Sequence, residues 1–136
     1  MRLIPIFIIF LLIPTIVFAD AKSDYDYQYT KYRDSYQEFT IFKKDYLNTP
    51  SLDNQQKVLL SLKQSLVSRD LAKSSLAWHL SDLINLNKVK YEPLSPILEM
   101  LSEARLYYLA KANEAQTLVT LSNLKEYDKS YLETST

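Results

Sequence analysis

The chain has 136 residues with no cysteine and no glycine, and its 16 lysines and arginines balance 16 aspartates and glutamates. The lack of cysteine excludes disulfides, thiolate catalysis and cysteine-ligated zinc, and the lack of glycine excludes the phosphate and dinucleotide loops that need close backbone approach. A neutral chain also lacks the basic footprint of a nucleic-acid binder, so no nucleic-acid partner is expected.

The first 19 residues form a composition block of their own and predict an export signal. An apolar run over residues 3–18 follows Arg2, which is the only charged residue before Asp20. A membrane span needs about 20 apolar residues, so the run fits the core of a signal peptide, with cleavage after Ala19 or Ala21. The alternative is a retained N-terminal anchor, which would be the chain's only expected membrane contact. Both interpretations place the rest of the protein outside the membrane, exported to the cell envelope or secreted.

Residues 24–48 are predicted as the first helix. Ser23 is the expected N-cap with Asp26 as its capping-box partner, and Pro50 ends the helix because the residue before a proline is pushed out of helical geometry. Aromatic residues at spacings of 4, 3, 4 and 3 predict a coiled-coil-like seam: Tyr25, Tyr29, Tyr32, Tyr36 and Phe39. We expect these rings to fill a core and to leave their hydroxyls at its rim. A ring surface that binds sugars or apolar peptides is the alternative.

Residues 54–86 are predicted as a second, longer helix that begins with a capping box at Asp53 and Gln56. At 1.5 Å per residue it spans about 50 Å against about 36 Å for the first helix, so it must contact more than one neighbour. One apolar face of this helix consists of Leu59, Leu62, Leu66, Leu76, Leu80, Leu83 and Ile84.

A second apolar ridge lies about a quarter-turn away on the same helix and consists of Leu60, Val67, Leu71 and Trp78. Either a later helix covers this ridge, or the ridge is exposed and marks a partner surface. These four residues are therefore the candidate interface. Trp78 is its expected hot spot, because tryptophan is enriched among the residues that dominate binding energies.

A third helix is predicted to begin at Pro96, with Ser95 as its cap. Its apolar face consists of Ile97, Leu101, Ala104, Tyr108, Ala115 and Leu118. Poor helix formers and a fresh capping-box pattern at residues 123–126 predict a break near residues 118–122. A short fourth helix over residues 124–133 then presents Leu124, Tyr127 and Tyr131. One bent helix across the whole region is the alternative.

Short linkers between long helices make neighbours in the sequence antiparallel. The expected fold is all-α: an up-down antiparallel helical bundle of three long helices plus a short fourth, with coiled-coil-like packing, in one domain over residues 24–134. The fourth helix is too short to cover the others. One end of the bundle is therefore three-stranded, or a partner completes it.

No residue pattern predicts catalysis. His79 is the only histidine, whereas bundle di-metal sites need two Glu-x-x-His pairs, and a haem site would need Met100 to meet His79 in the core. Glu99 and Glu103 are four residues apart and are expected on a solvated face, and no Ser-His-Asp order with a strand–turn–helix context is present. We expect a protein that is not an enzyme and has no metal and no cofactor, with His79 at the rim.

The order of signal peptide, tyrosine-rich helix, Asn-Thr-Pro turn and long leucine-rich helix resembles a family of uncharacterised exported proteins from bacteria of the candidate phyla radiation. The matching residues are the run 25–39 and the segment from Lys43 to Tyr46, with weaker echoes at Arg69-Asp70 and Ser95-Pro96. The resemblance implies an all-α fold outside the membrane and supplies no activity.

The leading hypothesis is an exported, non-catalytic bundle that acts through protein–protein contacts at the cell envelope, as a structural or adaptor component. A protein partner or a second copy would pack on the candidate interface. The alternative is a periplasmic-type holdase chaperone that binds unfolded clients along the long amphipathic hairpin. A chaperone is expected to suppress client aggregation, whereas a structural component is expected to have one specific partner.

Overall fold

The computed structural model describes residues 20–87, 90 and 93–134, so the expected signal peptide, residues 1–19, lies outside the described residues. The described chain forms four helices: α1 (Ala21–Asn48), α2 (Leu52–Leu86), α3 (Leu94–Thr117) and α4 (Leu121–Thr134). The predicted all-α bundle is confirmed. Among the helices of this described part, none is both long enough and apolar enough to cross a bilayer.

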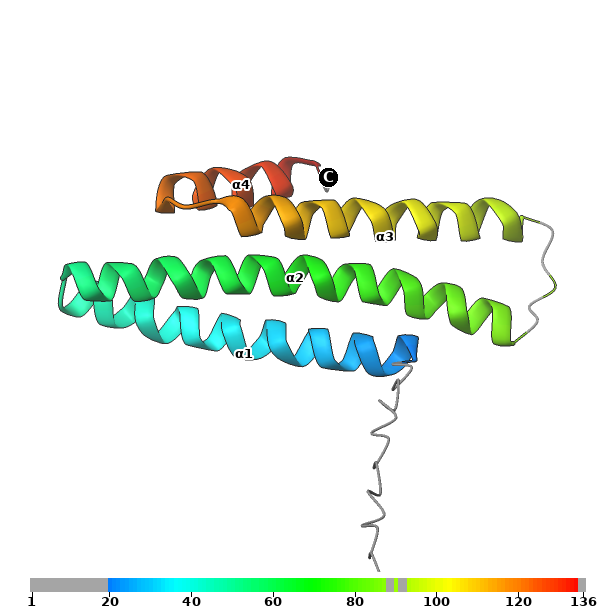
Figure 1. The fold of residues 1–136 in the computed structure, drawn as a ribbon, viewed down its shortest axis with the longest axis horizontal. Coiled ribbons are helices and arrows are strands. Elements are labelled where there is room, and N and C mark those ends of the chain that lie inside the picture. The colour runs from blue at the N-terminus through cyan, green and yellow to red at the C-terminus, as the bar shows by residue number, and fades with distance from the viewer. Residues whose placement is uncertain (1–19, 88–89, 91–92, 135–136) are drawn as a thin grey trace, which may run out of the picture.

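The 35-residue helix α2 is the centre of the bundle. Helices α1 and α3 both pack extensively along it, and each helix runs antiparallel to the one before it (Figure 1). The 14-residue helix α4 turns back from the end of α3 and also contacts α2. The expectation that the longest helix contacts more than one neighbour is confirmed, because α2 packs against the other three.

Helices α1 and α2 begin slightly earlier than predicted, because other residues cap them. Oδ1 of Asp20 accepts a hydrogen bond of 2.7 Å from the backbone N–H of Ser23, which holds the pKa of Asp20 below its usual value. The hydroxyl oxygen of Ser51 accepts a 3.1 Å hydrogen bond from the N–H of Asn54. The prediction of Ser23 and Asp53 as caps is therefore wrong, and both lie inside the first turn. The predicted helix ends at Asn48 and Leu86 are confirmed.

The break between the third and fourth helices is confirmed, and the single bent helix is wrong. Leu118 has extended backbone angles (φ −70°, ψ 134°) and ends α3. Thr120 then caps α4, since its hydroxyl oxygen accepts a 3.2 Å hydrogen bond from the N–H of Asn123. At the other end of α3 the helix begins at Leu94, so Ser95 lies inside the first turn and is not the cap.

The α1–α2 interface packs rings against small residues. The residues of α1 that face α2 follow a 4-3 spacing: Ala21, Tyr25, Gln28, Tyr32, Ser35, Phe39, Phe42 and Tyr46. The facing residues of α2 also follow it and are mostly small: Val58, Ser61, Ser65, Ser68, Ala72, Ser75 and His79. Large side chains opposite small ones interdigitate without voids. The hydroxyl of the buried Ser61 keeps its hydrogen bond within the helix and donates to the carbonyl of Lys57. The hydroxyl of Ser75 instead donates to the carboxylate of Asp24 on α1.

The predicted tyrosine seam is correct at alternate positions only. Tyr25, Tyr32 and Phe39 lie at the interface, whereas Tyr29 and Tyr36 are 49% and 53% exposed. Gln28 and Ser35, one residue earlier, take their places at the interface. The outer rings instead lie beside the inner ones, as in the Tyr25–Tyr29 and Tyr32–Tyr36 pairs, whose ring centroids are 5.9 and 6.2 Å apart.

The best buried apolar cluster lies where α4 meets α2 and α3, and it consists of Leu66, Ala115, Leu124 and Tyr127. The α3 face predicted from the sequence is confirmed, since its residues are buried or half-buried. The apolar face predicted for α2 is correct only in its first half. Leu76, Leu80 and Leu83 are exposed, because α4 ends before it reaches them. The side chain of Tyr131 lies outside the described part.

Candidate functional site: an open groove along α2

One side of α2 forms a groove between α1 and α3. Five residues of α2, each seven positions after the last, line three cavities on this side: Lys57, Gln64, Leu71, Trp78 and Asn85. A seven-residue spacing keeps side chains in one row along a helix that packs as in a coiled coil. We call this feature the α1/α3 groove. Helix α4 packs on the other side of α2, against Leu59, Leu62 and Leu66.

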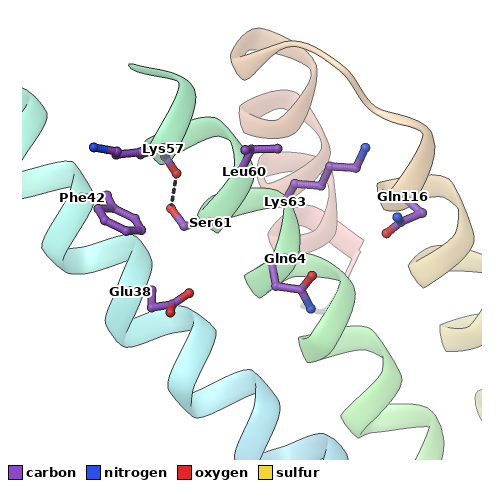
Figure 2. Close-up of a pocket in the computed structure, with 8 residues that line it drawn as sticks. All are labelled: Glu38, Phe42, Lys57, Leu60, Ser61, Lys63, Gln64 and Gln116. Atoms are coloured by element: carbon purple, nitrogen blue, oxygen red, sulfur yellow. Dashed lines mark hydrogen bonds between the residues drawn. The ribbon is translucent and has the colours of Figure 1, made fainter. Parts of the chain in front are cut away.

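The widest cavity of the groove, about 410 Å³, lies near the start of α2. Figure 2 shows Glu38 and Phe42 on the α1 wall, Gln116 on the α3 wall, and Leu60 and Gln64 on α2 between them. The two further cavities, of about 200 and 230 Å³, follow toward the end of α2, and the second of these is lined by α2 and α3 alone. Trp78 lines both of these smaller cavities, so its indole lies at the centre of this end of the groove.

Trp78 carries a stacked cation. The guanidinium carbon of Arg105 on α3 lies 4.7 Å from the centroid of the indole ring, which is a cation–π contact. Among the described residues no carboxylate lies within ion-pair distance of Arg105. The hydroxyl of Ser74 donates a 3.0 Å hydrogen bond to the backbone carbonyl of Arg105, which fixes α3 against α2 at this level. The guanidinium thus lies against the indole, on a backbone that the Ser74 hydrogen bond joins to α2.

The four candidate interface residues belong to this side of α2, but they differ in exposure. Leu60 is 56% exposed at the wide cavity. Leu71 and Trp78 are half-buried and line the narrower part. Val67 is half-buried and packs against the core cluster, so α3 covers it in part. The ridge is therefore neither fully covered nor fully exposed, and it forms part of the floor and α3 edge of the groove.

A buried polar cluster that the sequence did not predict joins the other side of α2 to α4. Asp70 is fully buried, and its Oδ2 lies 2.7 Å from the hydroxyl of Tyr127. That hydroxyl also lies 2.8 Å from the carbonyl oxygen of Lys111 on α3. Arg69 adds a 2.6 Å ion pair to Asp128 on α4. In the sequence, the one sign that Asp70 is buried is its position. It follows Leu66 by four residues and precedes Ala77 by seven, on a face of α2 that is otherwise buried.

Burial changes the ionisation of groups at this cluster. Burial raises the pKa of Tyr127 well above its usual value, and the hydrogen bond to Asp70 raises it further. Burial and the nearby charge of Arg69 lower the pKa of Lys73. The hydrogen bond from Lys111 to Glu114 raises the pKa of that lysine. The cluster thus favours a neutral phenol at Tyr127, and it serves to attach α4.

The single histidine is placed in the α1–α2 interface. The rings of His79 and Tyr25 are stacked, with centroids 6.2 Å apart and planes within 10°. Met100 is exposed, so the two side chains do not meet in a core. No group of three or more metal-ligating side chains gathers anywhere in the described ranges. The residues that line the α1/α3 groove instead present apolar side chains, amides, hydroxyls and charged groups, which are groups that bind other molecules by non-covalent contacts.

Comparisons of the chain with protein-family models, with curated proteins and with solved structures find no match.

Proposed function

We propose that this protein is an exported, non-catalytic helical bundle that binds a partner helix in the α1/α3 groove, as a structural or adaptor component of the cell envelope. The observation that carries the proposal is the row of α2 residues seven positions apart that lines three successive cavities, while α4 occupies the opposite side. A groove between two helices over a third has the shape and repeat that an amphipathic helix needs. The envelope location rests on the N-terminal composition alone.

The spacing of apolar residues supports a helical occupant. Leu60, Leu71 and Trp78 are 11 and 7 residues apart, and a helix packed along α2 repeats its contacts at these intervals. Phe42 and Leu109 add apolar surface from the two walls. A partner with apolar residues at heptad spacing would cover the floor, and polar side chains at its edges would face the walls.

Site-specific photo-crosslinking in the native envelope tests the proposal. A photoreactive amino acid is placed at position 60 in the groove, and a matched control at position 106, where Leu106 is 64% exposed on α3. The lining residues do not include Leu106. We expect one discrete crosslinked species from position 60 and none from position 106. A crosslinked dimer would identify a second copy as the partner. The same adducts from both positions, or none from position 60, would contradict the proposal.

A holdase chaperone is the second candidate, and exposed apolar side chains beyond the end of α4 favour it. Leu76, Leu80 and Leu83 are exposed on α2, and Met100 is exposed on α3. Client-aggregation assays separate the two functions. A holdase suppresses the aggregation of several unrelated unfolded proteins, and polar substitution of the three leucines abolishes this effect. A structural component does not suppress aggregation.

A further inference from the structure

We propose that the α1/α3 groove selects a helix with charged edges of opposite sign: a carboxylate on the edge that faces α3 and a basic side chain on the edge that faces α1. This inference rests on the proposed function, and it specifies the chemistry of the partner in that same groove.

The α3 wall supplies the cation. Arg105 lines both narrow cavities, and its guanidinium is stacked on Trp78. Stacking on a ring leaves the in-plane N–H donors of a guanidinium free, and these donors match the two oxygens of a carboxylate. Among the described residues no acidic side chain already takes this position. A carboxylate on the partner would therefore complete a bidentate pair.

The α1 wall supplies the anions. Asp24 and Glu38 line the narrow and the wide cavity, respectively. Asp24 accepts a hydrogen bond from the hydroxyl of Ser75 and stays directed at the groove. Glu38 points toward Gln64 across the wide cavity (Figure 2), and within the described part of the chain no cation pairs with it. Lys57 and Lys63 also line this cavity, but their ammonium groups point away from Glu38. Lys31 lies between these two acids in the sequence, but its ammonium is over the ring of Tyr27.

Arg105 and Glu38 lie at different levels of the groove, which gives the site a direction. Arg105 lies beside Ser74 and Trp78, whereas Glu38 lines the same cavity as Ser61 and Gln64. These levels are separated by about 10 to 17 residues of α2, or roughly 15 to 26 Å at 1.5 Å per residue. A partner helix pairs both charges only if its acid and its base are separated by a similar distance, and only in one of its two orientations.

Two synthetic peptides test the inference against the full chain. Both are 25-residue amphipathic helices with the same heptad row of leucines and the same composition. In the first peptide a glutamate is placed for Arg105 and a lysine for Glu38. In the second peptide these two residues are moved to the side of the helix that faces away from the groove, because a simple exchange would restore both pairs when the helix binds in the reverse orientation. Trp78 is the chain's only tryptophan, so its fluorescence reports binding at the groove directly, provided that the peptides contain none.

We expect the first peptide to bind about tenfold more tightly than the second, because only the first peptide places charges of opposite sign against Arg105 and Glu38. Arg105→Glu is expected to abolish the preference, because the first peptide then faces one attractive and one repulsive charge. Lys125→Glu changes the charge equally on α4, at a position that lines none of the three cavities, and is expected to leave the preference unchanged. Arg105→Gln, which adds no negative charge and leaves the pair at Glu38, is expected to reduce the preference to about threefold while the protein stays helical by circular dichroism.

The outcomes separate this inference from the proposed function. Equal affinity of the two peptides for the unmodified protein, with a clear change in Trp78 fluorescence, overturns the charge selection and leaves the groove as a helix-binding site. No fluorescence response to either peptide overturns both. A preference that survives Arg105→Glu also contradicts the assignment of Arg105.

Discussion

The hydroxyl of Tyr127 on α4 lies 2.7 Å from Oδ2 of Asp70 on α2, and the two side chains are 5% and 0% exposed. This contact joins the short last helix to the centre of the bundle. Leu124, one turn earlier on α4, is fully buried in the same region. Because α4 is held on this side of α2, the α1/α3 groove on the other side stays open.

Tyr127→Phe is expected to lower the free energy of unfolding by about 1 kcal/mol at neutral pH, because it removes a buried hydrogen bond. The pKa of Tyr127 is raised in the folded state above the usual value of 10.0. The folded state therefore favours the neutral phenol, and this stabilisation is complete below pH 10 and is lost as the pH rises further. Urea unfolding of both proteins from pH 7 to 11 should show the difference shrinking above pH 10.

The control for this titration is Tyr27→Phe, since Tyr27 is exposed on α1. This variant is expected to unfold as the unmodified protein does at every pH. The difference in free energy of unfolding between the unmodified protein and Tyr127→Phe could instead grow above pH 10. That result would show that the phenol does not need to stay neutral.

Asp70→Ala is expected to lower the free energy of unfolding by about 3 kcal/mol, because it removes the buried carboxylate that both Tyr127 and Arg69 contact. Asp70→Asn keeps an acceptor oxygen for Tyr127 and should cost less. Asp128→Ala removes a half-exposed partner of Arg69 and should cost no more than about 1 kcal/mol. Chemical denaturation ranks the three variants. The same cost for all of them would refute the central role of Asp70.

The packing of α1 against α2 predicts that position 65 tolerates only a small side chain. Ser65 is buried opposite the rings of α1. Ser65→Leu is expected to destabilise the protein by about 1 to 3 kcal/mol through overpacking, whereas Ser65→Ala should change stability by less than about 0.5 kcal/mol. Thermal and urea unfolding measure both. A stabilising leucine would mean that the interface contains unfilled space.

The register of α1 is tested by comparing Tyr32→Ala with Tyr36→Ala. Tyr32 faces α2, whereas Tyr36 is mostly exposed. The loss of free energy of unfolding should be larger for Tyr32→Ala, and Tyr36→Ala should stay within about 1 kcal/mol of the unmodified protein. Equal losses would instead support the seam predicted from the sequence, in which both rings are buried.

Helix ends and breaks were readable from the sequence because they depend on local chemistry. Pro50 stops α1 near Asn48. The break before α4 is preceded or formed by poor helix formers, which are Thr117, Val119 and Thr120. Cap positions were less certain, because Asp20 and Ser23 both have suitable oxygens and only the three-dimensional path of the chain selects between them. The selected cap in each case was the earlier residue.

The interface register and the buried acid could not be predicted from periodicity. Tyr25 and Tyr32 belong both to the predicted seam and to the observed one, and the choice between Tyr29 and Gln28 depends on what α2 presents. The buried face of α2 is rich in serine, so its composition resembles a solvated surface. Asp70 is buried only because Tyr127 and Arg69, one of them 57 residues away, supply its partners.

The side of α2 on which α4 packs was also not predictable, since either side of α2 presents leucines. That choice decides whether Leu60, Leu71 and Trp78 face a helix of the same chain or an open groove. The four candidate interface residues were therefore recognised as one ridge, while the walls formed by Glu38 and Arg105 emerged only from the fold.

The protection of a single cysteine in the native envelope tests the central claim most directly. The natural chain has no cysteine, so Leu60→Cys and the control Leu106→Cys each carry one thiol. In the purified protein both should react readily with a maleimide, because both positions are exposed. In the native envelope we predict that the thiol at position 60 reacts much more slowly while the thiol at position 106 is unaffected. Unchanged reactivity at position 60 would contradict an occupied groove.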